Sequence, residues 1–250
     1  MNLTQKIIGS HLVSGTMTPG SEIGLRIDQT LTQDATGTMA WLQFEALGIP
    51  RVKTDISLSY VDHNTLQMNF RNPDDHRFLR TVAAKFGGVY SGPGTGICHQ
   101  LHLENFAKPG ATLVGSDSHT RYGAIGTMGV GEGGPELVKQ LLQNTYDVAK
   151  PQVVLVWLTG EVPHGVGPHD VAIALCGATY KNGFVKNKVL EFAGPGVKHL
   201  PMDFRIGIDV MATETACLSS IWETDEKVEE YLAIHGRPDA YRPLRVEEGA

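Results

Sequence analysis

The apolar positions of the chain follow two spacings in turn. Continuous runs such as 112–116 and 153–158 are typical of buried strands, whereas Phe78, Val82 and Phe86 recur every four residues, as on one face of a helix. The same criteria predict strands at 23–31, 56–61, 96–98, 112–116, 152–158 and 188–192. They predict helices at 6–13, 39–47, 72–87, 168–176 and 225–236, and a further helix that starts at Pro135. This alternation indicates an α/β fold with mainly parallel sheets in three-layer α/β/α domains.

Polar residues precede two of the predicted helices. Asp34 stands before the helix at 39–47, and Thr224 stands before the helix at 225–236. Because the side-chain oxygens of such residues accept hydrogen bonds from free backbone N–H groups, we expect both residues to cap the helices.

The length of 250 residues accommodates one large domain or two smaller ones. We expect a first α/β/α domain over 1–150 that carries most of the candidate site residues. A second, smaller α/β domain is expected over 151–250. Its last stretch, 237–250, shows no periodicity and is expected to be a linker or a loose end.

The composition excludes several classes of partner. Lys plus Arg number 21 and Asp plus Glu number 27, and without a basic stripe we expect no nucleic acid. The longest apolar run, 153–158, is too short to span a membrane, and the N-terminus lacks the layout of a signal peptide. The three cysteines, Cys98, Cys176 and Cys217, form no Cys-x-x-Cys pair, so we expect a reduced cytoplasmic protein.

Acid–base side chains follow three of the predicted strands directly. In open α/β sheets, ligands bind at the carboxyl ends of the strands. Carboxylate, hydroxyl and imidazole groups placed there can accept, donate and transfer protons. We therefore expect these residues to form the wall of an active site. They are Asp62 and His63, then His99, and then Asp117, Ser118 and His119.

Structural alternatives exist for the histidines. Asp62 and His63 would also suit a surface turn, since Asn64 follows them. The spacing His99-x-x-His102 would align two metal ligands on one helical turn, but no third ligand at a fixed spacing is evident. We favour a functional His99 and a structural His102.

The remaining candidates are also weighed against structural roles. Asp117 or Ser118 could cap a helix; without a Gly-x-Ser-x-Gly motif, we interpret Ser118 as a substrate-binding hydroxyl rather than a nucleophile. The glycine run 129–134 formally matches a dinucleotide-binding motif, but we predict no strand before it and favour a role in shaping a pocket or turns. Glu214 has an apolar context, and because an unpaired buried carboxylate is costly, we expect it to meet a cation or an imidazole.

Several motifs occur together in register. They are Asp34-Ala35-Thr36-Gly37-Thr38-Met39, Val61-Asp62-His63, Pro93-Gly94-Thr95-Gly96-Ile97-Cys98-His99-Gln100 and Gly115-Ser116-Asp117-Ser118-His119-Thr120, with 158–162 and 194–197 later in the chain. In this order and spacing the chain resembles the aconitase family of iron–sulfur hydro-lyases. It is most similar to the N-terminal part of the family's bacterial single-chain members.

The resemblance implies the reversible dehydration and hydration of a hydroxy-di- or tricarboxylate such as citrate or isocitrate. It also implies a [4Fe-4S] cluster as the Lewis acid. Asp62 and His63 match the pair that handles the leaving hydroxyl, and His99 and His119 match active-site histidines. A related activity, such as that of homoaconitase or isopropylmalate dehydratase, stays open.

Further roles follow from the same resemblance. Asp117 and Ser118 match cluster-side and substrate-binding positions, and Glu214 matches a glutamate that pairs with a histidine. Thr38 stands where a substrate-binding glutamine is usual. Two further departures are Val210, where an asparagine usually supports the cluster, and Ala216-Cys217-Leu218-Ser219-Ser220, where Gly-Ala-Thr-Thr-Ser is usual. Changes beside a metal site can retune its affinity or activity.

The family's cluster cysteines, serine base and carboxylate-binding arginines belong to motifs that this sequence lacks. We therefore expect no metal ligands within the chain, and neither cluster binding nor hydratase turnover by the isolated chain. A continuous gene product or a second chain would supply the cysteines and a swivelling domain. The alternatives are a non-catalytic remnant or partner-binding module and, from the glycine run alone, a nucleotide-binding oxidoreductase.

Overall fold

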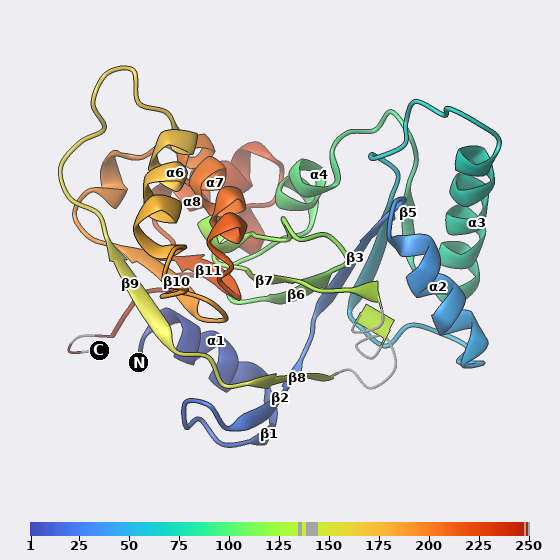
Figure 1. The fold of residues 1–250 in the computed structure, drawn as a ribbon, viewed down its shortest axis with the longest axis horizontal. Helices are drawn as coiled ribbons and strands as arrows, with labels where there is room; N and C mark the ends of the chain where they lie inside the picture. Colours follow the sequence, from blue (N-terminus) through green and yellow to red (C-terminus); the bar gives the residue numbers. More distant parts are fainter. Residues whose placement is uncertain (135–136, 139–144, 248, 250) are drawn as a thin grey trace.

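The computed structural model describes residues 1–134, 137–138, 145–247 and 249, and its largest sheet has five parallel strands (Figure 1). In spatial order these are β5 (Val89–Ser91), β4 (Ile56–Tyr60), β3 (Gln29–Gln33), β6 (Thr112–Gly115) and β7 (Met128–Gly131). β3 is the central strand, and every residue in it is buried. Its carboxyl end therefore lies between those of β4 and β6, which both pair with it in parallel.

Two smaller sheets complete the described part of the fold. One is parallel, in the order β11 (Ser219–Trp222), β10 (Val189–Ala193) and β9 (Val153–Trp157). The other is antiparallel, in the order β1 (Leu12–Gly15), β2 (Glu22–Arg26) and β8 (Thr145–Ala149). The prediction of an α/β fold with mainly parallel sheets is confirmed. The predicted strand 23–31 is two strands: β2 lies in the antiparallel sheet, and β3 lies in the large parallel sheet.

Helices cover the sheets and separate into groups. They are α1 (Leu3–His11), α2 (Gly37–Ala46), α3 (Arg71–Phe86), α4 (Cys98–Asn105), α6 (Pro168–Thr179), α7 (Met202–Met211) and α8 (Glu226–Ile234). Figure 1 shows α2 and α3 side by side near β5, and α6, α7 and α8 grouped beside the small parallel sheet. None of the described helices combines the length and apolar character needed to cross a membrane.

The small parallel sheet is the middle of three layers. Because successive residues of a strand point to opposite faces, Val189 of β10 packs with the apolar residues of α1, whereas Leu190 packs in the cluster that contains Ile208 of α7. The buried carboxylate of Glu191 also accepts the N–H of Thr4 at 2.7 Å, at the N-terminus of α1, where the helix dipole favours a negative charge.

The residues after α8 contact the rest of the protein. The guanidinium of Arg237 donates to the carbonyls of Leu103, Glu104 and Ala107 at the end of α4, and residue 244 is buried. The described part of 237–250 is therefore in contact with the body of the protein. The division of the chain near residue 150 stays a prediction.

The predicted strand at 96–98 is wrong. Cys98 begins α4, and Gly96 has a φ of +149°, a backbone angle that glycine adopts without a steric penalty. His99 therefore lies in the first turn of a helix rather than at a strand end. The predicted helix from Pro135 lies largely outside the described residues.

Both predicted helix caps are also wrong. The residue before α2 is Thr36, and the Asp34 carboxylate instead accepts N–H groups from the loop after β4. At α8 the cap is Asp225, whose side chain accepts the N–H of residues 227 and 228. Thr224 instead hydrogen-bonds residues 242 and 244.

Candidate active site

Asp117 is the centre of the candidate site, because histidines from three segments surround its carboxylate. Its Oδ1 lies 3.0 Å from His99 Nε2 and 3.7 Å from His119 Nδ1, and its Oδ2 lies 3.3 Å from His63 Nε2. Burial raises the pKa of Asp117, but the hydrogen bond from His99, the backbone N–H of His119 and the nearby histidine charges lower it by more. The carboxylate therefore stays ionised well below its usual pKa range.

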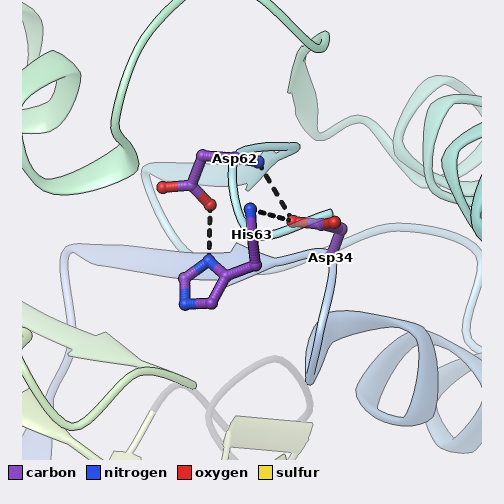
Figure 2. A group of neighbouring side chains, drawn as sticks. All are labelled: Asp34, Asp62 and His63. Carbon is purple, nitrogen blue, oxygen red and sulfur yellow. Dashed lines mark hydrogen bonds and ion pairs between the residues drawn. The ribbon is translucent and has the colours of Figure 1, made fainter. Parts of the chain in front are cut away.

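Asp62 and His63 lie one residue beyond the end of β4, and their side chains bond to each other (Figure 2). His63 Nδ1 lies 2.7 Å from Asp62 Oδ1, and the other Asp62 oxygen accepts the N–H of Cys98 at 2.6 Å. Neighbours on a strand would point to opposite faces, but β4 ends at Tyr60, so the two side chains can meet.

Both ring nitrogens of His63 face carboxylates. Nδ1 faces Asp62 and Nε2 faces Asp117, so a protonated imidazolium has an acceptor for each of its N–H groups. Partial burial lowers the pKa of His63, but the hydrogen bond to Asp62 and the charges of Asp62, Asp117 and Asp34 outweigh it and raise the pKa overall. His63 is therefore suited to carry a proton near neutral pH.

Asp34 holds the backbone of this pair in place. Its Oδ1 accepts the N–H groups of Asp62 and His63 at 3.0 and 2.9 Å, and its Oδ2 accepts the N–H of Asn64 at 2.8 Å (Figure 2 draws the first two). Burial raises the pKa of Asp34, but these N–H groups lower it by more. The end of β3 thus fixes the chain where β4 ends.

His99 has two polar partners, one for each ring nitrogen. Nδ1 lies 2.9 Å from the hydroxyl of Tyr122, and Nε2 lies 3.0 Å from Asp117. Because burial raises the pKa of Tyr122 well above its usual value, the hydroxyl keeps its proton and can donate it to Nδ1. Nε2–H then donates to Asp117, which fixes the tautomer of His99.

His102 packs against the ring of Tyr122, with ring centroids 5.1 Å apart, but its own nitrogens bond to core residues. Its Nδ1 lies 3.2 Å from the hydroxyl of Tyr60, and its Nε2 lies 2.8 Å from the amide oxygen of Gln29. Burial, with a smaller effect from the charge of His99, lowers its pKa to about 3. A ring that stays neutral and fully hydrogen-bonded inside the core has no free nitrogen for a metal.

Glu214 meets His119, the imidazole partner that was expected, but Glu214 is exposed, so the burial on which that expectation rested is wrong. His119 Nε2 lies 3.1 Å from Glu214 Oε1 in η3 (Ala212–Thr215). The Ser118 hydroxyl lies 3.3 Å from His119 Nδ1, and Thr213 donates to the Ser118 carbonyl at 2.7 Å. Ser118 is exposed, so its hydroxyl is accessible to a ligand.

The glycine run is explained by packing. A Cβ on Gly131 would overlap the carbonyl of Asp117, and a Cβ on Gly129 would come within 2.8 Å of the carbonyl of Thr120. The 117–120 turn therefore lies directly on β7. The run begins inside this strand, contrary to prediction, and its first glycines admit the turn that carries the site.

Thr38 is separate from the paired groups. It lies in the first turn of α2, and its buried hydroxyl oxygen has no hydrogen-bond partner among the described residues. Two site residues were not predicted. Gln33, which donates to Asp117 at 3.4 Å, ends β3, so the strand-end criterion could have identified it. Tyr122 has no comparable signal in the sequence.

Asp34, Asp62 and His63 also resemble a metal site, since each places one ligand atom within 4.8 Å of the others (Figure 2). Their atoms already have partners: Asp34 accepts three backbone N–H groups, and Asp62 accepts the N–H of Cys98 and pairs with His63. We therefore interpret the group as a scaffold for the loop rather than as a metal site.

The cysteines do not fit an iron–sulfur cluster. Cys98 and Cys217 are buried, and burial raises the pKa of both thiols, whereas iron is bound by thiolates. Among the residues that the structure describes, no three cysteines gather as possible ligands. The described chain thus provides acid–base groups but no ligand set for a cluster.

The fold and the site define an α/β protein in which imidazole–carboxylate pairs gather where adjacent parallel strands end. The chain belongs to the aconitase family (aconitate hydratase), which it matches over residues 5–248.

The relatives include two kinds of enzyme. The chain is 33% identical over 253 residues to the mitochondrial aconitate hydratase of Schizosaccharomyces pombe, covering 95% of this chain and 32% of that protein. It is 32% identical over 232 residues to the 3-isopropylmalate dehydratase large subunit 2 of Archaeoglobus fulgidus, covering 92% of this chain and 56% of that protein. It is 30% identical over 251 residues to the 3-isopropylmalate dehydratase large subunit of Elusimicrobium minutum, covering 99% of this chain and 59% of that protein. The chain thus spans about a third of the first relative and less than two thirds of the other two.

Proposed function

We propose that this chain forms one wall of the active site of an aconitase-type hydro-lyase, which dehydrates and rehydrates a hydroxy-di- or tricarboxylate such as citrate or isocitrate. One observation carries the proposal: three imidazole–carboxylate pairs from separate segments converge around Asp117. The pairs are Asp62–His63, Asp117–His99 and Glu214–His119. Relatives named as aconitate hydratases and isopropylmalate dehydratases support the same class.

The chemistry of dehydration explains why such pairs are useful. Loss of water requires a proton for the departing hydroxyl, and His63, with its raised pKa and its carboxylate partners, is the best-placed donor. Asp62 orients the ring and stabilises its charged form. In the reverse direction, the same imidazole accepts the proton from the incoming water.

The other pairs are proposed to bind and orient the substrate. Ser118 can donate its hydroxyl to a substrate carboxylate, and His119, oriented by Glu214, can donate a second hydrogen bond beside it. His99 stays fixed between Tyr122 and Asp117 and contributes polarity without needing to move. Thr38 is proposed as a substrate contact only through its position in the family motif.

The family's [4Fe-4S] cluster supplies a Lewis acid for the hydroxyl, and its ligands are proposed to lie outside this chain. They would come from a longer product or from a second chain with the swivelling domain. The names of the isopropylmalate dehydratase relatives, which are large subunits, support a second chain. We further propose a cytoplasmic protein, with a role in the tricarboxylic acid cycle if citrate is the substrate.

A second candidate is a related hydratase that acts on homoaconitate or isopropylmalate. Two positions support this alternative function: Thr38 replaces the family's substrate-binding glutamine, and Val210 replaces the asparagine that usually supports the cluster. A non-catalytic subunit or remnant would retain the fold and the pairs without turnover.

Anaerobic reconstitution tests the proposal. The chain is incubated with iron and sulfide, alone and with a polypeptide that carries the family's cluster cysteines, and hydration of cis-aconitate and dehydration of isopropylmalate are measured. We expect no cluster absorbance and no turnover from the chain alone, and both from the mixture. In the mixture, His63→Ala should lower the rate by about 10²-fold or more, whereas His164→Ala, at an exposed loop histidine, should not. A mixture that loads a cluster and stays inactive on both substrates would favour the non-catalytic alternative.

A further inference from the structure

A cavity beside α3 is lined by residues outside the paired groups, and one of them, His76, faces Asp34. The cavity has a volume of about 320 Å³, is open to solvent, and is bordered by α3 and by the segments around Gln67 and Tyr90. His76, Arg77 and Arg80 line it from α3. Arg80 is four positions from His76 and three from Arg77, so it shares a helix face with each of them, and all three side chains border the cavity.

The two arginines have no carboxylate partner among the residues that the structure describes. Neither Arg77 nor Arg80 forms an ion pair within the described ranges of the chain, whereas Arg205 pairs with Asp225 at 2.6 Å. Both guanidinium groups belong to exposed residues. The cavity therefore brings together two guanidinium groups without a carboxylate partner among the described residues, and the one acidic group that faces its lining is Asp34, opposite His76.

His76 connects the cavity to the active-site scaffold. It is 6% exposed, and its buried Nε2 makes no hydrogen bond, although it lies 3.4 Å from Asp34 Oδ2. Its Nδ1 lies 3.5 Å from the amide nitrogen of Gln67. The imidazole therefore lies between the cavity and the Asp34 carboxylate, so a change in the cavity can be sensed at His76.

We propose that this cavity is a binding site for a small multivalent oxyanion, a dicarboxylate or a phosphate, held by Arg77 and Arg80 with His76 at its base. Guanidinium groups bind carboxylates and phosphates through parallel hydrogen bonds. Tyr90 adds a hydroxyl to the rim; burial raises its pKa, so it keeps a proton to donate.

The site is distinct from the paired groups around Asp117. The residues that line the cavity do not include Asp62, His63 or Ser118. The connection is indirect: the anion contacts His76, His76 faces Asp34, and Asp34 holds the backbone of the Asp62–His63 pair. The proposal stands without the hydro-lyase activity, because it depends only on charges and a cavity in this chain.

Nuclear magnetic resonance titration tests it. Inorganic phosphate and succinate are added separately to the chain at constant ionic strength, and the imidazole resonance of His76, assigned with His76→Gln, is followed. We expect a saturable shift with at least one of the two anions, and the tighter of the two identifies the ligand chemistry. Arg77→Gln and Arg80→Gln should each weaken binding roughly tenfold, the value of one charge-assisted hydrogen bond.

Matched controls separate this site from others. Arg71→Gln removes an exposed charge from the same helix outside the cavity, and Ser118→Ala alters the paired site; both should leave the affinity unchanged. Because Arg77 and Arg80 are exposed, their variants are expected to fold, which circular dichroism verifies. Absence of a saturable shift with both anions, or equal weakening by Arg71→Gln, overturns the proposal.

Discussion

His119 Nε2 lies 3.1 Å from Glu214 Oε1, although the two residues are 95 positions apart in the chain. The contact joins the turn after β6 to η3. Both side chains are partly accessible, with 36% of His119 and 52% of Glu214 exposed. A pair of this kind contributes little to stability and is available to a ligand.

Glu214→Gln should therefore separate activity from stability. We expect the free energy of unfolding to change by less than about 1 kcal/mol, since an exposed ion pair is worth no more. In the reconstituted mixture the hydratase rate should fall by about 10²-fold, the usual contribution of an oriented acid–base group. Urea titration and initial rates measure the two effects. The control is Glu161→Gln, at an exposed carboxylate 3.8 Å from His199; an equal loss of rate there would contradict the prediction.

Asp62→Asn should lower the pKa of His63, because the hydrogen bond to Asp62 is the largest influence that raises it. With a raised folded-state pKa, His63 stabilises the fold fully below its unfolded pKa of about 6.5, and this contribution is lost as the pH rises through the folded value. In the variant, the free energy of unfolding should change less with pH between the unfolded and the folded pKa of His63. Imidazole titration by nuclear magnetic resonance measures the pKa; an unchanged pKa would refute the assignment, and Asp74→Asn on α3 serves as the control.

Asp117→Asn should change the acid sensitivity of the fold. The lowered pKa of Asp117 means that its stabilisation is present above the unfolded pKa of about 3.9 and is lost as the pH falls through the folded value. Wild type should therefore exceed the variant in stability at pH 7, and the difference should shrink toward low pH. Urea midpoints at a series of pH values test this. A difference that is constant with pH would show that ionisation of Asp117 does not contribute.

Asp34→Ala should destabilise the protein by about 3 kcal/mol, because it leaves three backbone N–H groups of the 62–64 loop without an acceptor. Asp34→Asn retains one acceptor oxygen, so its free energy of unfolding should lie between those of wild type and Asp34→Ala. Chemical denaturation gives the free energies. Asp55→Ala, at an exposed position, is the control and should stay within about 0.5 kcal/mol of wild type; a loss as small for Asp34→Ala would exclude the scaffold role.

Gly123→Ala should destabilise the contact between η1 (Gly123–Ile125) and β11. A Cβ at this position would overlap the backbone carbonyl of Ser220, which cannot move without disturbing the strand. We expect a loss of about 3 kcal/mol in thermal or urea unfolding. Gly9→Ala in α1, where a Cβ meets nothing within 4 Å, should instead stabilise by about 0.5–1 kcal/mol. Equal effects of the two changes would contradict this account.

Much of the architecture follows from the sequence, because local patterns determine it. The apolar runs identify β4, β6, β9 and β10, and the recurrence of apolar residues every four positions identifies α3. The residues at the ends of β4 and β6 were recognisable for the same reason. The carboxyl ends of parallel strands lie at one edge of the sheet, so Asp62 and Asp117 could be expected at the same edge once both strands were assigned.

Tertiary structure alone determined which side chains of the candidate site hydrogen-bond to one another. Asp34 has the sequence context of a helix cap, yet its carboxylate bonds the loop after β4, because β3 and β4 are neighbours in the sheet. Tyr122 reaches His99 in α4, and Glu214 in η3 reaches His119, only because segments distant in the chain pack together. Local sequence determines which element forms, since its periodicity is set within a few residues. Which carboxylate meets which imidazole depends on contacts between segments distant in the chain, and these exist only in the folded protein.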